Sequence, residues 1–148
     1  MKHSISLIMA LIAFALFSSC GENSSLTQEM TDPEGTMIMN LKNDAHYDDM
    51  SWNGAQIRLL SDYNIGATGD LAYLGTGKGL RDINTDKVPQ NGWMNYISAQ
   101  EHGLYILRYE QAYCGIYVQS AIVGTGSGII GYTIKYCPFT PGKGWGWD

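Results

Sequence analysis

The stretch GLYILRYEQAYCGIYVQSAIVGTGSGIIGYTIKYCPF, residues 103–139, decides the fold of this chain. Apolar and polar side chains alternate along it with a period of two, and β-branched and aromatic residues dominate, as a half-buried pleated surface requires. Two breaks separate three such runs, at residues 104–109, 115–123 and 129–136. The stretch therefore predicts an antiparallel β-meander against which the rest of the chain packs.

Residues 1–19 are typical of a secretory signal peptide, because their apolar run over 5–17 is too short to span a bilayer comfortably. The run ends in Phe17-Ser18-Ser19-Cys20-Gly21, which resembles a bacterial lipobox with Phe17 where leucine is more common. We expect cleavage before Cys20 and lipidation of its thiol. The alternative is a secreted protein that is cut nearby and keeps Cys20 as an unpaired thiol. After lipidation, residues 20–30 would form a flexible tether to the membrane.

The charge balance is acidic, with 9 Lys and Arg against 14 Asp and Glu and a net charge of −5. Nucleic acid or an anionic lipid surface would need a basic face on the protein, so neither is expected as a partner. The expected partners are the membrane, through the N-terminal lipid, and a glycan or an envelope protein. No cofactor is expected.

Residues 31–148 have the length of a single domain. No segment after the signal peptide shows sustained helical periodicity, and additional strands are predicted at 36–42, 56–60, 71–74 and 93–100. About seven short strands with turns between them predict an all-β domain, either an antiparallel β-sandwich or a small barrel. Binding loops are expected within the glycine-rich region 66–92, and a tail rich in Trp and Gly follows at 140–148.

Cys114 and Cys137 flank the last predicted hairpin, in a compartment where disulfides can form. If a tight turn is centred on Thr125 and Gly126, the two cysteines lie directly opposite each other, near enough for a structural disulfide. A shifted register would leave both thiols reduced. The sequence leaves both alternatives open.

Several short motifs follow one another along most of the expected mature chain, from about residue 32 to residue 139. They are Asp32-Pro33-Glu34-Gly35-Thr36, Gly79-Leu80-Arg81-Asp82-Ile83, Lys87-Val88-Pro89 with Gly92-Trp93, Ile116-Tyr117-Val118, Ile129-Ile130-Gly131 and the closing segment 136–139. Together they resemble a family of small Bacteroidales-type envelope lipoproteins classed as a domain of unknown function. The resemblance implies a predominantly β protein anchored in the envelope, and it implies no activity.

Asp82, Asn84 and Asp86 place oxygen donors at alternate positions, as in the first half of an EF-hand calcium loop. However, Lys87 stands where that loop needs glycine, and Trp93 stands where it needs a bidentate glutamate. These side chains are therefore expected to hydrogen-bond their own backbone, and a metal site is only a weak candidate.

Other motifs for catalysis are incomplete. Residues 75–79, GTGKG, lack the spacing of a phosphate-binding loop and are expected to form a turn. His46 and His102 are the only histidines after the signal peptide. Neither is accompanied by a sequence motif for a nucleophile that it could activate as a base. No catalytic residues are predicted.

Four tryptophans provide the remaining candidates for ligand binding. Trp52, Trp93, Trp145 and Trp147 stand beside loops or in the tail, where indole rings can stack on sugar rings. Alternatively, Trp52 and Trp93 belong to the core or to a lid, and the tail covers a sheet edge.

We expect a lipid-anchored, non-enzymatic structural or interaction protein of the cell envelope, at the outer membrane. A carbohydrate-binding module that captures glycans is the second hypothesis, and a glycan hydrolase is the third.

Overall fold

The computed structural model describes residues 28–29, 35–40, 50–60, 62–126 and 128–146. The predicted signal peptide, Cys20, residues 21–27 and 30 of the predicted tether, His46 and Trp147 lie outside these residues. Residues 28–29, which were also expected to belong to the flexible tether, form a short strand.

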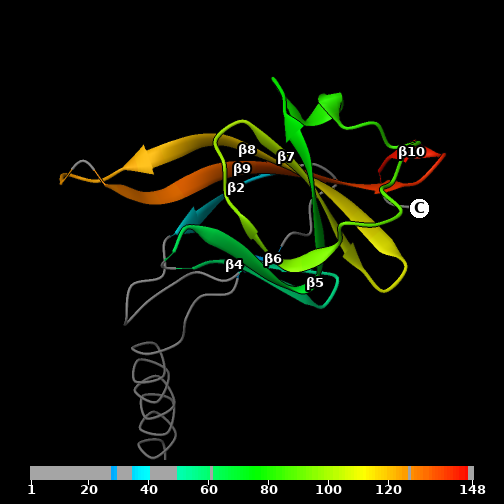
Figure 1. Ribbon diagram of the computed structural model, residues 1–148, viewed down its shortest axis with the longest axis horizontal. Helices are drawn as coiled ribbons and strands as arrows, with labels where there is room; N and C mark the ends of the chain where they lie inside the picture. Colours follow the sequence, from blue (N-terminus) through cyan, green and yellow to red (C-terminus); the bar gives the residue numbers. More distant parts are fainter. Residues whose placement is uncertain (1–27, 30–34, 41–49, 61, 127, 147–148) are drawn as a thin grey trace, which may run out of the picture.

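All the strands described belong to one sheet, which curls into a half-barrel (Figure 1). The strands are β1 (Gln28–Glu29), β2 (Gly35–Asn40), β3 (Met50–Trp52), β4 (Ala55–Leu59), β5 (Asn64–Thr76), β6 (Met94–Ser98), β7 (Gly103–Tyr109), β8 (Ala112–Val123), β9 (Ile129–Thr140) and β10 (Gly144–Trp145), with one 3-10 turn, η1 (Leu80–Asp82). The main path through the sheet is β1-β3-β4-β5-β7-β8-β9-β10, and β2 and β6 add to β9 and β5. Every pairing is antiparallel except that of β1 with β3.

This arrangement confirms the predicted all-β antiparallel fold with its C-terminal meander. Of the two predicted forms, the small barrel is the closer one, because a single sheet curls until β2 lies beside β4. The strands at 56–60 and 93–100 are confirmed as β4 and β6, with small differences at their ends. The strand predicted at 71–74 is the middle of the much longer β5, which pairs with β4, β6 and β7.

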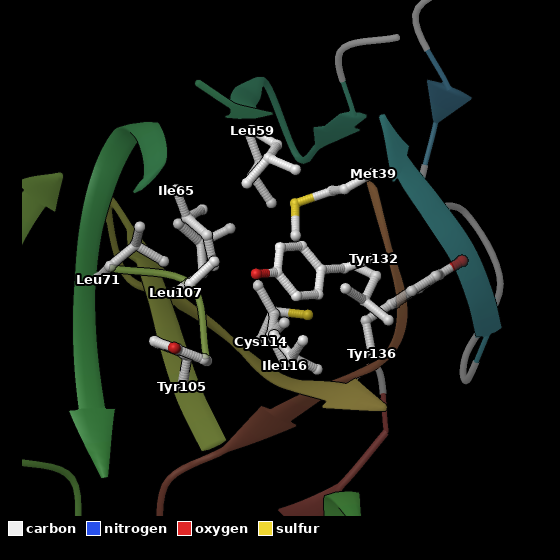
Figure 2. Packing of buried hydrophobic residues seen from close by; sticks show 14 of the residues in the cluster. Met39, Leu59, Ile65, Leu71, Tyr105, Leu107, Cys114, Ile116, Tyr132 and Tyr136 are labelled. Atoms are coloured by element: carbon white, nitrogen blue, oxygen red, sulfur yellow. The ribbon is translucent and has the colours of Figure 1, made fainter. Parts of the chain in front are cut away.

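Side chains on the concave face of the sheet form the inner cluster, to which β2, β4, β5, β7, β8 and β9 all contribute. Figure 2 shows Tyr132 in the middle of this cluster, between Met39 and Cys114. Tyr105 is fully buried here, and its hydroxyl donates to Ser98 O at 2.7 Å and accepts the Gln100 N–H at 2.9 Å. Burial raises the pKa of Tyr105 to about 12, because the ionised phenolate would lose its water.

A second set of side chains, the outer cluster, covers the opposite face of β7, β8 and β9. Successive side chains of a strand point to opposite faces, so Ile106 and Tyr117 belong to the outer cluster while Leu107 and Ile116 belong to the inner one. Residues from the 80–93 segment and Trp145 from β10 pack over the outer face. The meander is therefore buried on both faces, and the start of this covering segment borders one of the surface hollows described below.

The pairing of β8 with β9 matches the alternative of a shifted register, in which Cys114 and Cys137 stay reduced. Cys114 lies opposite Pro138, and Gly115 lies opposite Cys137, so the two cysteines are offset by one position. An offset of one residue places the two side chains on opposite faces of the sheet, and Cys114 joins the inner cluster while Cys137 joins the outer one. Both thiols are free and buried. The physical cause is the position of the turn: Val123 pairs with Ile129, which centres the hairpin on Gly126. The extra residues Gln119 on β8 and Ile130 on β9 offset each other, so the same register continues to the cysteines.

We predict that Cys114 and Cys137 remain unlinked even after expression in an oxidising compartment. Burial raises the pKa of the Cys114 thiol, so the reactive thiolate form is disfavoured in the folded protein. Alkylation without reduction, followed by peptide mass spectrometry, should find both residues alkylated only after denaturation. A peptide pair joined through Cys114 and Cys137 would contradict the observed register.

Two glycines of β5 provide a matched test of the packing of the sheet. A Cβ atom at Gly69 would overlap the backbone carbonyl oxygen of Arg108 on β7, whereas a Cβ at Gly66 would meet only Leu60 and Arg58 side-chain atoms at 3.4 Å or more. Gly69→Ala should therefore lower the free energy of unfolding by about 1 to 3 kcal/mol, because β7 must shift. Gly66→Ala should change it by less than about 0.5 kcal/mol. Equal effects in urea denaturation would contradict this packing.

Candidate functional site

A hollow of about 700 Å³ lies on the outer face of the sheet, beside the outer cluster; we call it the cationic cleft. Its walls come from four separate parts of the chain: the segment around η1, the turn between β6 and β7, and the strands β8 and β9. The lining residues are Lys78, Gly79, Leu80, Arg81, Asp82, Glu101, His102, Tyr117, Gln119, Ser120 and Lys135.

The wall around η1 is fixed by local hydrogen bonds and by one buried anchor. The Lys78 N–H donates to Asp82 Oδ2 at 2.6 Å, and the Asp82 N–H donates to Gly79 O at 3.1 Å, which together close the loop. The Leu80 side chain is buried in the outer cluster. The loop is therefore held against the sheet while Lys78 and Arg81 remain exposed.

The bulge in β8 shapes the floor of the cleft. In a regular strand Gln119 and Ser120 would face opposite sides of the sheet, because side chains alternate. Here Val118 pairs with Ile134 and Ser120 pairs with Thr133, so Gln119 is the extra residue, and both Gln119 and Ser120 line the cleft. Bulges commonly redirect side chains beside binding sites.

His102 forms the wall opposite η1. It takes a positive φ of 63° in the turn before β7, and its backbone N–H donates to the backbone carbonyl oxygen of Val118 at 2.7 Å. Its Nδ1 lies 3.1 Å from the Tyr117 hydroxyl, and the two rings are stacked with centroids 6.4 Å apart. Tyr117 is nearly buried, so this contact fixes the orientation of the exposed imidazole. Its other nitrogen, Nε2, lies 3.9 Å from Glu101 Oε1.

The charge of the cleft differs from that of the whole chain. Lys78, Arg81 and Lys135 bring three cations from two distant segments, against the two carboxylates of Asp82 and Glu101. The cations therefore exceed the carboxylates by one, and Asp82 also accepts the backbone N–H of Lys78. The chain as a whole has a net charge of −5, so this concentration of cations is a local property of the cleft.

Two of the three side chains of the weak calcium candidate bond to the backbone of their own loop, as expected from the sequence. Asp82 Oδ2 accepts the Lys78 N–H, and Asn84 Oδ1 accepts the Asp86 N–H at 3.0 Å, so these side chains bond to the backbone of their own loop. Within the described residues no group of three His, Cys, Asp or Glu side chains is placed to hold a metal ion.

The tryptophans within the described residues do not form a common ligand site. Trp52 is buried in the inner cluster, while Trp93 and Trp145 are partly buried in the outer cluster. The Trp145 ring lies against Gly115, where a Cβ atom would come within 2.7 Å of it, and packs on Phe139 with centroids 5.5 Å apart. Their positions match the alternative in which they belong to the core and to a cover.

Each covering tryptophan also carries a cation on its ring. The Arg81 guanidinium lies 4.9 Å from the centre of the Trp145 ring, and the Arg108 guanidinium lies 4.1 Å from that of Trp93. Arg108 also donates to Asp70 Oδ2 at 2.8 Å, across the β5–β7 pair. These contacts hold the covering segment and the tail on the sheet. The Arg81 contact also links the tail to the rim of the cleft.

The sequence did not identify the cleft, although it contained partial signals. Lys135 stands on the polar side of a strand pattern, and Lys78 and Arg81 stand in a glycine-rich segment expected to carry loops. No spacing rule relates residues 78 and 135, because only the three-dimensional fold brings them together. Gln119 reaches the cleft through a bulge that no sequence pattern indicated.

Comparisons of the chain with protein-family models, with curated proteins and with solved structures found no match. Among the described residues, no helix has the length and apolar character needed to cross a membrane.

Proposed function

We propose that the protein is a non-enzymatic interaction domain, anchored by a lipid at Cys20 to the outer membrane, which binds an anionic group in its cationic cleft. The observation that carries the proposal is the gathering of Lys78, Arg81 and Lys135 around one hollow of an otherwise acidic protein. The ligand is a carboxylate or a phosphate, on a small molecule or on an envelope partner.

The surroundings of the cations suit an anion that also carries hydroxyl groups. Gln119 and Ser120 offer an amide and a hydroxyl on the floor, and the oriented His102 ring offers a further polar edge. Hydrogen bonds between ionised groups are stronger and shorter than neutral ones, so the lysines and the arginine would supply most of the affinity. The neutral groups would then select among anions by their shape.

A binding role is preferred to hydrolysis because of how the two carboxylates are placed. A general acid in a glycosidase needs an enclosed carboxyl group whose pKa is raised. Glu101 is 49% exposed on its turn, and Asp82 is exposed and accepts a backbone N–H. Stacking of sugars on the tryptophans is not preferred either, because Trp52, Trp93 and Trp145 are engaged in the two clusters.

The proposed location depends on the N-terminal sequence. A short apolar run followed by Ser18-Ser19-Cys20 supports cleavage and acylation at the cysteine, and the resemblance to Bacteroidales-type envelope lipoproteins supports the same location. A domain tied in this way would present the cationic cleft to solutes or partners near the membrane surface.

Charge removal in the cleft tests the proposed function. The full chain in detergent micelles is titrated by calorimetry with phosphate, citrate and glucuronate, and with uncharged glucose. Lys78→Gln and Lys135→Gln should each weaken binding of the preferred anion about tenfold, equivalent to about 1.4 kcal/mol, because each removes one ionic contact. Raising the salt concentration should weaken binding further.

Lys87→Gln serves as the matched control, since Lys87 is exposed and does not line the cleft. It should leave the affinity unchanged within twofold. Anion binding that survives in the Lys78→Gln, Lys135→Gln double variant would contradict the proposal, and so would a wild-type chain that binds none of the three anions.

A further inference from the structure

A second hollow, of about 320 Å³, lies on the outer face of β4, β5 and β6, and none of its lining residues belongs to the cationic cleft. Its geometry follows from one row of paired residues across three strands: Arg58 on β4 lies opposite Gly66 on β5, and Gly66 lies opposite Tyr96 on β6. Side chains in such a row normally contact one another. Because the middle residue is glycine, a slot remains between Arg58 and Tyr96, and we call it the Gly66 slot.

An irregularity in the pairing of β5 with β6 extends the slot. Gly66 pairs with Tyr96, and the next pair is Leu71 with Met94, so several residues of β5 correspond to Asn95 alone. The strands therefore separate just beyond the slot, and Asn95 lines it. Irregularities of this kind are frequent beside binding sites.

Tyr96 is a preorganised wall of the slot. Its hydroxyl accepts a hydrogen bond from Asn64 Nδ2 at 2.6 Å and donates one to Asp62 Oδ2. Asp62 in turn accepts the Asn64 N–H at 3.2 Å. The hydroxyl is thus already engaged, while 41% of the residue remains exposed. What Tyr96 offers to a ligand is its fixed aromatic ring.

The remaining walls combine two apolar side chains, Leu60 and Ala67, with polar groups. Arg58 Nη2 donates to Gln56 Oε1 at 3.1 Å, and the Gln56 backbone N–H donates to Thr68 Oγ1 at 3.3 Å, so these side chains hold one another in place. The guanidinium of Arg58 and the amides of Gln56 and Asn95 present several N–H donors and carbonyl acceptors. Such groups pair well with vicinal hydroxyls, and no carboxylate lines the slot.

We propose that the Gly66 slot binds one neutral pyranose unit of a saccharide, with its apolar face on Tyr96 and its hydroxyls on Arg58, Gln56 and Asn95. An aromatic ring beside a few fixed polar groups is the usual composition of a pocket for an amphipathic ring. A volume of about 320 Å³ is at the lower end of the range for ligand pockets, which suits one sugar residue or the end of a chain.

The test is titration of the full chain in detergent micelles with neutral oligosaccharides of glucose, mannose, galactose, xylose and N-acetylglucosamine. The wild type should bind at least one of them. Gly66→Val should weaken that binding at least tenfold, because its side chain fills the slot, and Tyr96→Ala should do the same by removing the ring. Circular dichroism and thermal unfolding establish that each variant is folded. If Gly66→Val fails to fold, Gly66→Ala replaces it, since its Cβ meets only ordinary contacts.

Lys135→Gln is the matched control, because it alters the cationic cleft and leaves the Gly66 slot intact. It should leave saccharide binding unchanged, even where it weakens anion binding. The proposal is overturned if the folded wild type binds none of the oligosaccharides. It is equally overturned if a filled slot binds as tightly as the wild type, or if Lys135→Gln abolishes saccharide binding, which would assign the sugar to the cleft.

Discussion

The antiparallel pairing of β8 with β9 is the constraint on which the rest of the molecule depends. These long strands carry inner-cluster and outer-cluster residues in alternation, so one register decides the composition of both faces. A shift of one residue would exchange Ile116 with Tyr117 and would move a buried aliphatic side chain to the side of the cleft. Burial on both faces holds this register in place, since a shift of one residue in either direction would expose apolar surface.

Both candidate sites arise where this sheet departs from regular pairing. In the cationic cleft the extra residue Gln119 opens a floor between β8 and the segment around η1. In the Gly66 slot the missing side chain of Gly66 and the irregular β5–β6 pairing leave room beside Tyr96. The Gly66 slot is bordered by strands of the sheet, whereas the cationic cleft is bordered by β8, β9 and two loop segments, of which the one around η1 is closed by its own hydrogen bonds.

Much of the fold could be predicted from the sequence, since the alternation over 104–136 identifies three adjacent strands. The same rule underestimated β5, because Gly66, Gly69 and Asp70 lower its local strand propensity, and the strand forms through pairing with its neighbours on both sides. The exact register of β8 and β9 was also beyond a sequence argument, since it depends on where the turn is centred and on two irregularities, after Val118 and after Ile122, that no composition indicates. The candidate sites could not be predicted either, because the cationic cleft depends on the bulge in β8 and the Gly66 slot depends on the irregular pairing of β5 with β6.

The measurement that tests this account most directly is the pattern of cross-strand backbone NOEs in the full chain, isotopically labelled and in detergent micelles. The account predicts NOEs that join Gly115 to Cys137 and Ile116 to Tyr136, because these residues are paired. NOEs that place Cys114 directly opposite Cys137 would contradict it, since both clusters and the cationic cleft would then have to be built from different side chains.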